Sequence, residues 1–178
     1  ATLAEAVVAA HSATGSTVKL LTDNVLTEAI TSTATMTLDL NGKRLTKRNT
    51  AGEFFVEGGT LTLVDSVGDG TAETIRFTFR NGSRATLQSG KWGELHCFGL
   101  SRFSMEKGEA ASIIANCDFF EVRDGKVGYL NVQNIYVTLV GGFFGRIASS
   151  LTLAEGEKPI PSFQLLGGRH VFQKGDGR

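Results

Sequence analysis

Thr37-Leu38-Asp39-Leu40 and Thr60-Leu61-Thr62-Leu63 are two copies of a short, apolar, Thr-rich segment that recurs through the chain. The later copies are Thr86-Leu87-Gln88, Ile113-Ile114-Ala115, Thr138-Leu139-Val140 and Gln164-Leu165-Leu166. From Leu38, the steps in numbering between equivalent positions are 23, 26, 27, 25 and 26. A nearly fixed period in this range is typical of a repeat architecture, in which each repeat packs on its neighbours.

Two further sets of strand-like segments follow the same period. One set comprises residues 26–30, 54–56, 75–79, 100–105 and 127–132, and the other comprises residues 95–98, 119–122, 143–147 and 171–172. Three strand sets with one period predict three strands in each coil of about 25 residues, with parallel coils stacked about 4.8 Å apart. We therefore predict an all-β fold, a single-stranded parallel β-helix over residues 16–172 with a tail at 173–178. The crossover rule for parallel strands favours a right-handed coil.

One helix is expected, at the N-terminus. Thr2-Leu3-Ala4-Glu5 fits a capping box, and Leu3, Val7 and Ala10 fall on one helical face. Gly15 is a suitable stop signal. A helix within residues 1–15 would cover the open edge of the first coil, which would otherwise invite edge-to-edge association. The 178 residues are expected to form a single domain, 1–178.

The composition excludes several classes of protein. Eighteen basic and 18 acidic residues balance, so the electrostatic signature of a nucleic-acid binder is missing. No uninterrupted apolar run is long enough for a membrane span, so none is expected. Cys97 and Cys117 have no metal-binding spacing, and their offset in numbering misses the repeat period. We therefore expect free thiols and no metal or cofactor.

Residues 1–70 carry a specific resemblance. Thr17-Val18-Lys19-Leu20-Leu21-Thr22-Asp23, the strand and turn from Thr37 to Thr46, and Gly58 to Gly70 occur in an order that resembles pectin-lyase-like right-handed β-helix repeats in surface proteins of Gram-positive, often gut-dwelling, bacteria. Gly141-Gly142-Phe143-Phe144 resembles the turns of their later coils, and residues 153–177 loosely resemble their closing segment. The resemblance implies a secreted or wall-attached module of a longer protein. It implies no activity, because one superfamily holds lyases, hydrolases, adhesins and spacers.

The period predicts one charged column. His96, Glu121 and Arg146 are separated by one full period each, and His170 lies one position short of the next step. If these side chains point outward, an imidazole, a carboxylate and a guanidinium stack at about 4.8 Å, which suits ionic pairing. A surface ladder that fixes strand register is the first interpretation of this column. A polar groove for a sugar or an acidic glycan is the second, and catalysis by His96 with Glu121 is the third.

Trp92 is the one aromatic residue that sequence position sets apart. It lies in the turn-like segment Ser89-Gly90-Lys91-Trp92-Gly93, where an exposed indole beside Lys91 could stack on a sugar. Packing in the core, as expected for the periodic phenylalanines, is the favoured alternative.

Three functions remain open from the sequence. The first hypothesis is a non-catalytic extracellular or cell-surface module that binds a glycan or a host or cell-surface protein. The second is a polysaccharide lyase or glycoside hydrolase that uses Glu121, His96 and Arg146. The third is a structural spacer. Candidate ligand-binding residues are His96, Glu121, Arg146, Trp92 and Lys91.

Overall fold

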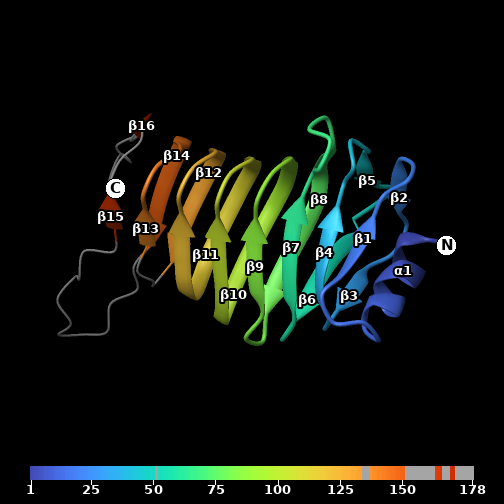
Figure 1. Ribbon diagram of the computed structural model, residues 1–178. Coiled ribbons are helices and arrows are strands. Elements are labelled where there is room, and N and C mark those ends of the chain that lie inside the picture. Colours follow the sequence, from blue (N-terminus) through green and yellow to red (C-terminus); the bar gives the residue numbers. More distant parts are fainter. Residues whose placement is uncertain (51, 134–136, 151–162, 166–168, 171–178) are drawn as a thin grey trace.

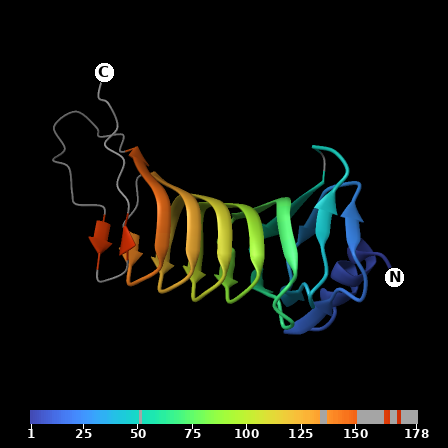
Figure 2. The ribbon, with the colours of Figure 1, turned by 90° about the horizontal axis from the view of Figure 1, so that it is seen from above.

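The computed structural model describes residues 1–50, 52–133, 137–150, 163–165 and 169–170 of the chain. The backbone winds into a parallel solenoid of about seven turns, which Figure 1 shows side by side with the N-terminal helix at one end. Figure 2 shows the same stack from above. The predicted all-β fold and the parallel β-helix are confirmed. The handedness of the coil stays a prediction.

Each coil has three faces, which are formed by three ladders of parallel strands. Face one is formed by β1 (Ser16–Lys19), β4 (Thr35–Asp39), β7 (Thr60–Val64), β9 (Arg84–Leu87), the last residues of β10 (Lys91–Met105) and β11 (Glu109–Val122), β13 (Val137–Leu139) and β15 (Phe163–Leu165). Face two is formed by β2 (Asn24–Leu26), β5 (Leu45–Lys47), the first residues of β8 (Thr71–Arg80), β10, β11, β12 (Lys126–Gln133) and β14 (Phe143–Ser150), and β16 (Arg169–His170). Face three is formed by β3 (Ile30–Ser32), β6 (Glu53–Glu57) and the later parts of β8, β10, β11, β12 and β14.

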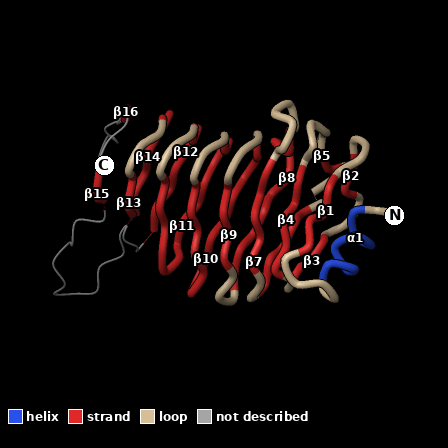
Figure 3. Tube along the Cα trace, in the orientation of Figure 1, coloured by secondary structure: helices blue, strands red, loops and turns tan. Residues whose placement is uncertain are grey.

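The coils in the middle of the stack are shorter than the predicted period, which holds for the early coils and again at the end of the stack, where Val137 pairs with Phe163, a step of 26. Thr35 pairs with Thr60 and Thr60 pairs with Arg84, which are steps of 25 and 24 in numbering. Arg84 then pairs with Arg102 and Arg102 with Phe119, which are steps of 18 and 17. These middle coils are shorter mainly because the turn between faces one and two is tighter: it spans 11 steps from Thr60 to Thr71 but only 7 at the paired positions Arg84 and Lys91. Figure 3 shows these coils as long strand segments joined by short turns.

The core lies inside the coils and is rich in stacked rings. Phe54 and Phe77 stack with ring centroids 5.3 Å apart, and Trp92 meets Phe77 edge-on at 5.4 Å. Phe103 and Phe120 stack at 5.3 Å. All five rings are almost completely buried. Offset and edge-on ring pairs add to the stabilisation that burial of their area provides.

The helix α1 (Leu3–Ala10) has the predicted capping box. The Thr2 hydroxyl accepts a hydrogen bond from the Glu5 amide at 3.2 Å, and the Glu5 carboxylate accepts one from the Thr2 amide at 2.8 Å. Leu3, Val7 and Ala10 are buried against the first coil, as the helical pattern predicts. The part of the chain that the structure describes has no helix that is both long and apolar enough to cross a membrane.

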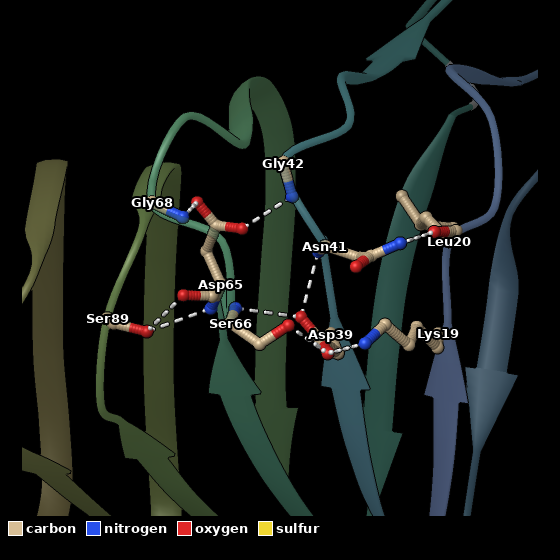
Figure 4. Close-up of polar contacts among 9 residues, drawn as sticks. All are labelled: Lys19, Leu20, Asp39, Asn41, Gly42, Asp65, Ser66, Gly68 and Ser89. Atoms are coloured by element: carbon tan, nitrogen blue, oxygen red, sulfur yellow. Dashed lines mark hydrogen bonds and ion pairs between the residues drawn. The ribbon is translucent and has the colours of Figure 1, made fainter.

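Two buried aspartates hold the turns that follow face one in the early coils (Figure 4). The Asp39 carboxylate accepts hydrogen bonds from the Ser66 hydroxyl at 2.8 Å and from the amides of Asn41 and Ser66 at 2.8 and 3.0 Å. Burial raises the pKa of Asp39, but these hydrogen bonds and the nearby Lys19 ammonium outweigh it, so the pKa lies below its ordinary value. The negative charge therefore remains on Asp39 and links two successive turns.

Candidate functional site

The predicted column of His96, Glu121 and Arg146 does not form, because the coils in this part of the chain are shorter than the period that predicted it. His96 pairs with Thr78 and Ile114 on face three. Glu121 lies on face one, so its carboxylate and the His96 imidazole belong to different sides of the solenoid.

Glu121 and Arg146 each have other partners. The Glu121 carboxylate accepts a hydrogen bond from Arg123 Nε at 3.1 Å. Arg146 pairs in register with Tyr129 on face three, and its guanidinium lies 5.5 Å from the centre of the Tyr129 ring. The backbone of His170 pairs with Phe144 on face two. The three predicted site residues and His170 are thus not brought together.

His96 instead lies at the end of an ionic network on face three. Arg76 donates to Glu53 at 3.0 Å and to Glu94 at 2.7 Å, and the Glu94 carboxylate lies 3.6 Å from His96 Nε2. That Nε2 atom is buried and makes no hydrogen bond in the described structure. Burial, and next the positive charge of Arg76, lower the pKa of His96, so the imidazole is neutral near pH 7. Because Nε2 is covered, the imidazole offers no exposed nitrogen to a ligand on that side.

Trp92 belongs to the core, and the hypothesis of an exposed indole is wrong. Its side chain is 1% exposed, and its Nε1–H donates to the Ser89 carbonyl at 2.7 Å. The indole therefore supports the surface above it and presents no ring to solvent.

Lys91, the neighbour of Trp92, begins an exposed row on face two. It pairs in register with Glu109, which pairs with Lys126, which pairs with Phe143. We call these four residues the Lys–Glu–Lys–Phe row. Lys126 Nζ lies 3.1 Å from the Glu109 carboxylate, and the Phe143 ring is 45% exposed. The row therefore combines two ammonium groups, a carboxylate and an aromatic ring on four neighbouring coils.

Shallow hollows lie on both sides of this row. One, of about 350 Å³, is lined by the row, by Ala111 and Gly128, and by buried Trp92 beneath them. The other, of about 470 Å³, lies toward the turns and includes Gly108, Gly125 and Gly142 in its lining. Concave, largely apolar surfaces with a few polar groups are typical of ligand sites.

Part of the lining of the first hollow, Ala111 and Gly128, belongs to a set of small residues that the chain places at one corner of successive coils. These residues are Gly93, Ala111, Gly128 and Gly145, which follow the register of the later coils. A Cβ atom on Gly128 would lie 2.6 Å from the Ala111 carbonyl oxygen, and one on Gly93 would lie 2.4 Å from that of Ile75. The close approach of the coils thus excludes larger side chains there and leaves the corner open.

Sequence reasoning missed Glu109, Lys126 and Phe143, although a signal for them was present. Gly90, Gly108, Gly125 and Gly142 each have a positive φ, and they recur at steps of 18, 17 and 17 in numbering. Such regularly spaced turn glycines mark equivalent positions on successive coils. Each of the four is followed directly by a member of the Lys–Glu–Lys–Phe row.

Cys97 and Cys117 are free and buried. The expectation of free thiols rested on an offset that misses the repeat period, but Cys117 pairs with Gly99 and Cys97 pairs with Ala115, so the two residues lie on neighbouring coils. The interaction with the Cys117 thiol, and next burial, raise the pKa of Cys97.

Within the described residues, no group of three or more His, Cys, Asp or Glu side chains is arranged to hold a metal ion. Comparison of the chain with protein-family models, with curated proteins and with solved structures finds no match.

Proposed function

We propose that the chain is a non-catalytic glycan-binding module, and that a glycan strand lies on face two along the Lys–Glu–Lys–Phe row. The observation that carries this proposal is the pair of hollows beside the row, one in contact with all four of its residues and the other with the last three. Lys91, Glu109 and Lys126 offer donors and acceptors at intervals of one coil, about 4.8 Å. A ligand that itself repeats along its length can use such a ladder several times.

The side chains of the row suit neutral or weakly charged sugars. Ammonium and carboxylate groups hydrogen-bond with hydroxyl groups, and the exposed Phe143 ring offers an apolar surface to the face of a sugar. The charges of Glu109 and Lys126 compensate one another at 3.1 Å. Recognition of hydroxyl groups is therefore favoured over recognition of a strong net charge.

The resemblance of residues 1–70 supports an extracellular or cell-surface location for this module, within a pectin-lyase-like β-helix protein of a Gram-positive bacterium. The lyase or hydrolase hypothesis rested on His96, Glu121 and Arg146, which lie on different faces or with other partners. It remains a prediction without a site. A spacer without a ligand is the outcome that the following experiment distinguishes.

The test is binding of the purified chain to an array of bacterial and host glycans, followed by calorimetric titration of each glycan that binds. We expect Phe143→Ala and Lys126→Gln each to weaken binding about tenfold, because each removes one contact of the row. Phe119→Ala and Lys43→Gln are the matched controls. Phe119 is 40% exposed on face one, close to the 45% of Phe143, and Lys43 lies in the turn before β5.

Two results contradict the proposal. A chain that binds no glycan on the array would be a spacer or a protein-binding module. A chain whose glycan binding is weakened equally by the control variants and by the variants of the row would bind somewhere other than face two.

A further inference from the structure

Face one carries two adjacent arginines that have no acidic partner among the residues that the structure describes. Arg84 of β9 and Arg102 of β10 are paired in register, and both side chains are exposed. The strands alternate, with Ala85 and Phe103 buried directly after them, so both guanidinium groups leave the same side of the sheet. Like charges at directly opposed positions destabilise a sheet. The arrangement is therefore one that the fold alone does not favour.

The neighbouring outward rows, one on the same two strands and one directly after their ends, are internally satisfied. Two positions along, the hydroxyl groups of Thr86 and Ser104 lie 3.2 Å apart and share a hydrogen bond. Two positions further, Gln88 Nε2 donates to the Glu106 carboxylate at 3.3 Å. The arginine row is thus the one of these three in which the cross-strand pair is repulsive.

Three other arginines in the described part of the chain have carboxylate partners. Arg76 bonds Glu53 and Glu94, Arg80 bonds Glu57, and Arg123 bonds Glu121. The side chain of Arg84, in contrast, has no hydrogen bond, ion pair or ring contact with any residue that the structure describes.

The residues that flank the pair add no negative charge, and one of them restrains the Arg102 side chain. Thr60 precedes Arg84 in the row and Phe119 follows Arg102, so no carboxylate interrupts the row on either side. The Arg102 guanidinium lies 5.5 Å from the centre of the Phe119 ring, a cation–π contact that limits its motion. The carboxylate of Glu121 on the adjacent row is bonded to Arg123.

We infer that Arg84 and Arg102 form a binding site for a tetrahedral oxyanion, a sulfate or phosphate group carried by a larger ligand. Each guanidinium presents a planar fork of donors that matches two oxygens of such a group. The hydroxyl groups of Thr86 and Ser104 lie next along the strands; one donates to the other, which leaves one further donor. Occupation of the site would also relieve the repulsion between the two arginines. This site is on face one, so it is independent of the surface proposed for glycans on face two.

The test is a titration of the isotope-labelled protein with sodium sulfate and, separately, with phosphate, in which sodium chloride keeps the ionic strength constant. The Nε–H resonances of Arg84 and Arg102 should shift in a saturable manner, and the melting temperature should rise with ligand concentration. Sodium acetate is a third titrant, because a planar monoanion should bind more weakly than a tetrahedral dianion. Comparison of sulfate with phosphate shows which oxyanion the site prefers.

Variants separate a site from general attraction of anions. Arg84→Gln and Arg102→Gln should each weaken sulfate binding about tenfold or more, and Arg102→Lys should also weaken it because a lysine keeps the charge but lacks the fork. Arg48→Gln, which removes an exposed positive charge elsewhere, should leave the titration unchanged. Without sulfate, Arg84→Gln should melt at the same temperature as the parent chain or higher, which shows that the variant is folded.

Shifts at Arg84 and Arg102 that are no larger than those at Arg48, or that increase linearly without saturation, would overturn the inference. Equal loss of binding in Arg48→Gln and Arg84→Gln would overturn it as well. None of these results bears on glycan binding by face two, which depends on different side chains.

Discussion

The Asp65 carboxylate reaches back one coil and accepts a hydrogen bond from the amide of Gly42 at 2.7 Å. Within its own turn, the same carboxylate accepts a bond from the amide of Gly68 at 3.0 Å (Figure 4) and one from the amide of Gly70 at 2.6 Å. One buried side chain therefore closes its own turn and attaches it to the preceding one. Strand pairing fixes the flat faces of the solenoid, and contacts of this kind fix its corners.

Replacement of Asp65 should destabilise the early coils. Asp65→Ala leaves three amide groups without their acceptor, and we expect a loss of about 3 kcal/mol in the free energy of unfolding. Urea denaturation followed by circular dichroism measures this loss. Asp69→Asn is the matched control in the same turn, because Asp69 is exposed. Equal stability of Asp65→Ala and the parent chain would show that water replaces the carboxylate.

Acid should weaken the fold through His96. Because the pKa of His96 in the folded chain lies below its ordinary value of 6.5, the unfolded chain binds the proton more readily. The contribution of the neutral imidazole to stability is therefore complete above pH 6.5 and is lost as the pH falls toward the folded-state pKa.

The variant His96→Gln tests this pH dependence. Its unfolding free energy should change less than that of the parent chain between about pH 5 and 7.5, the range in which a histidine titrates. An NMR titration of the His96 ring gives the folded-state pKa directly. A pKa of 6.5 or above in the folded protein would contradict the burial of Nε2.

Addition of a single methyl group at the open corner on face two should lower the free energy of unfolding. In Gly128→Ala the new Cβ would lie 2.6 Å from the Ala111 carbonyl oxygen, so neighbouring coils must separate. We expect a loss of about 1–3 kcal/mol, the usual cost of overpacking. Ala111→Gly, at the equivalent corner of the preceding coil, should cost about 1 kcal/mol or less. Comparable losses in both variants would show that the corner is not tightly packed.

The buried thiols should be chemically inert in the folded chain. The raised pKa of Cys97 keeps it protonated, and alkylating agents react with the thiolate. We therefore expect iodoacetamide at about pH 8, near the ordinary thiol pKa, to label neither Cys97 nor Cys117 until denaturant is added. Mass spectrometry counts the labels. Rapid labelling of the native chain would mean that the coils around 97–117 open readily.

The fold class could be predicted from sequence because alternating apolar residues and turn glycines are local signals. The register could not, because alternation leaves it ambiguous. Leu95 and Phe120 are separated by the predicted period and both are buried, yet Leu95 pairs with Phe77 and Ile113 whereas Phe120 lies on face one. Any wrong step that connects two buried positions satisfies the pattern equally well. The charged column failed for this reason.

The early coils show the same ambiguity on a smaller scale. The internal repeat of the sequence makes Leu38 equivalent to Leu61, whereas the structure pairs Leu38 with Leu63 and Met36 with Leu61. A shift by two positions keeps every buried side chain buried. Spacing of the positive-φ glycines is a better guide than spacing of the apolar residues, because a turn that needs such a glycine has no equivalent two positions away.

Of the Lys–Glu–Lys–Phe row, the sequence predicts only the first residue, Lys91. Lys91 was identified from its position beside Trp92, but its partners became visible only with the shorter register of the later coils. The residues that line a solenoid face are distant in sequence, so an error in coil length moves every partner to another face.

The short coils also limit which insertions and deletions the chain can accept. From Gly108 to Gly125, one circuit contains little beyond a strand and a tight turn. Deletion of residues 109–125 would join two equivalent turn positions of successive coils. Each remaining strand would still pair with a strand of the same face. The smallest tolerated insertion or deletion within these strands is then one whole circuit, and frame-preserving changes of a few codons are confined to the turns.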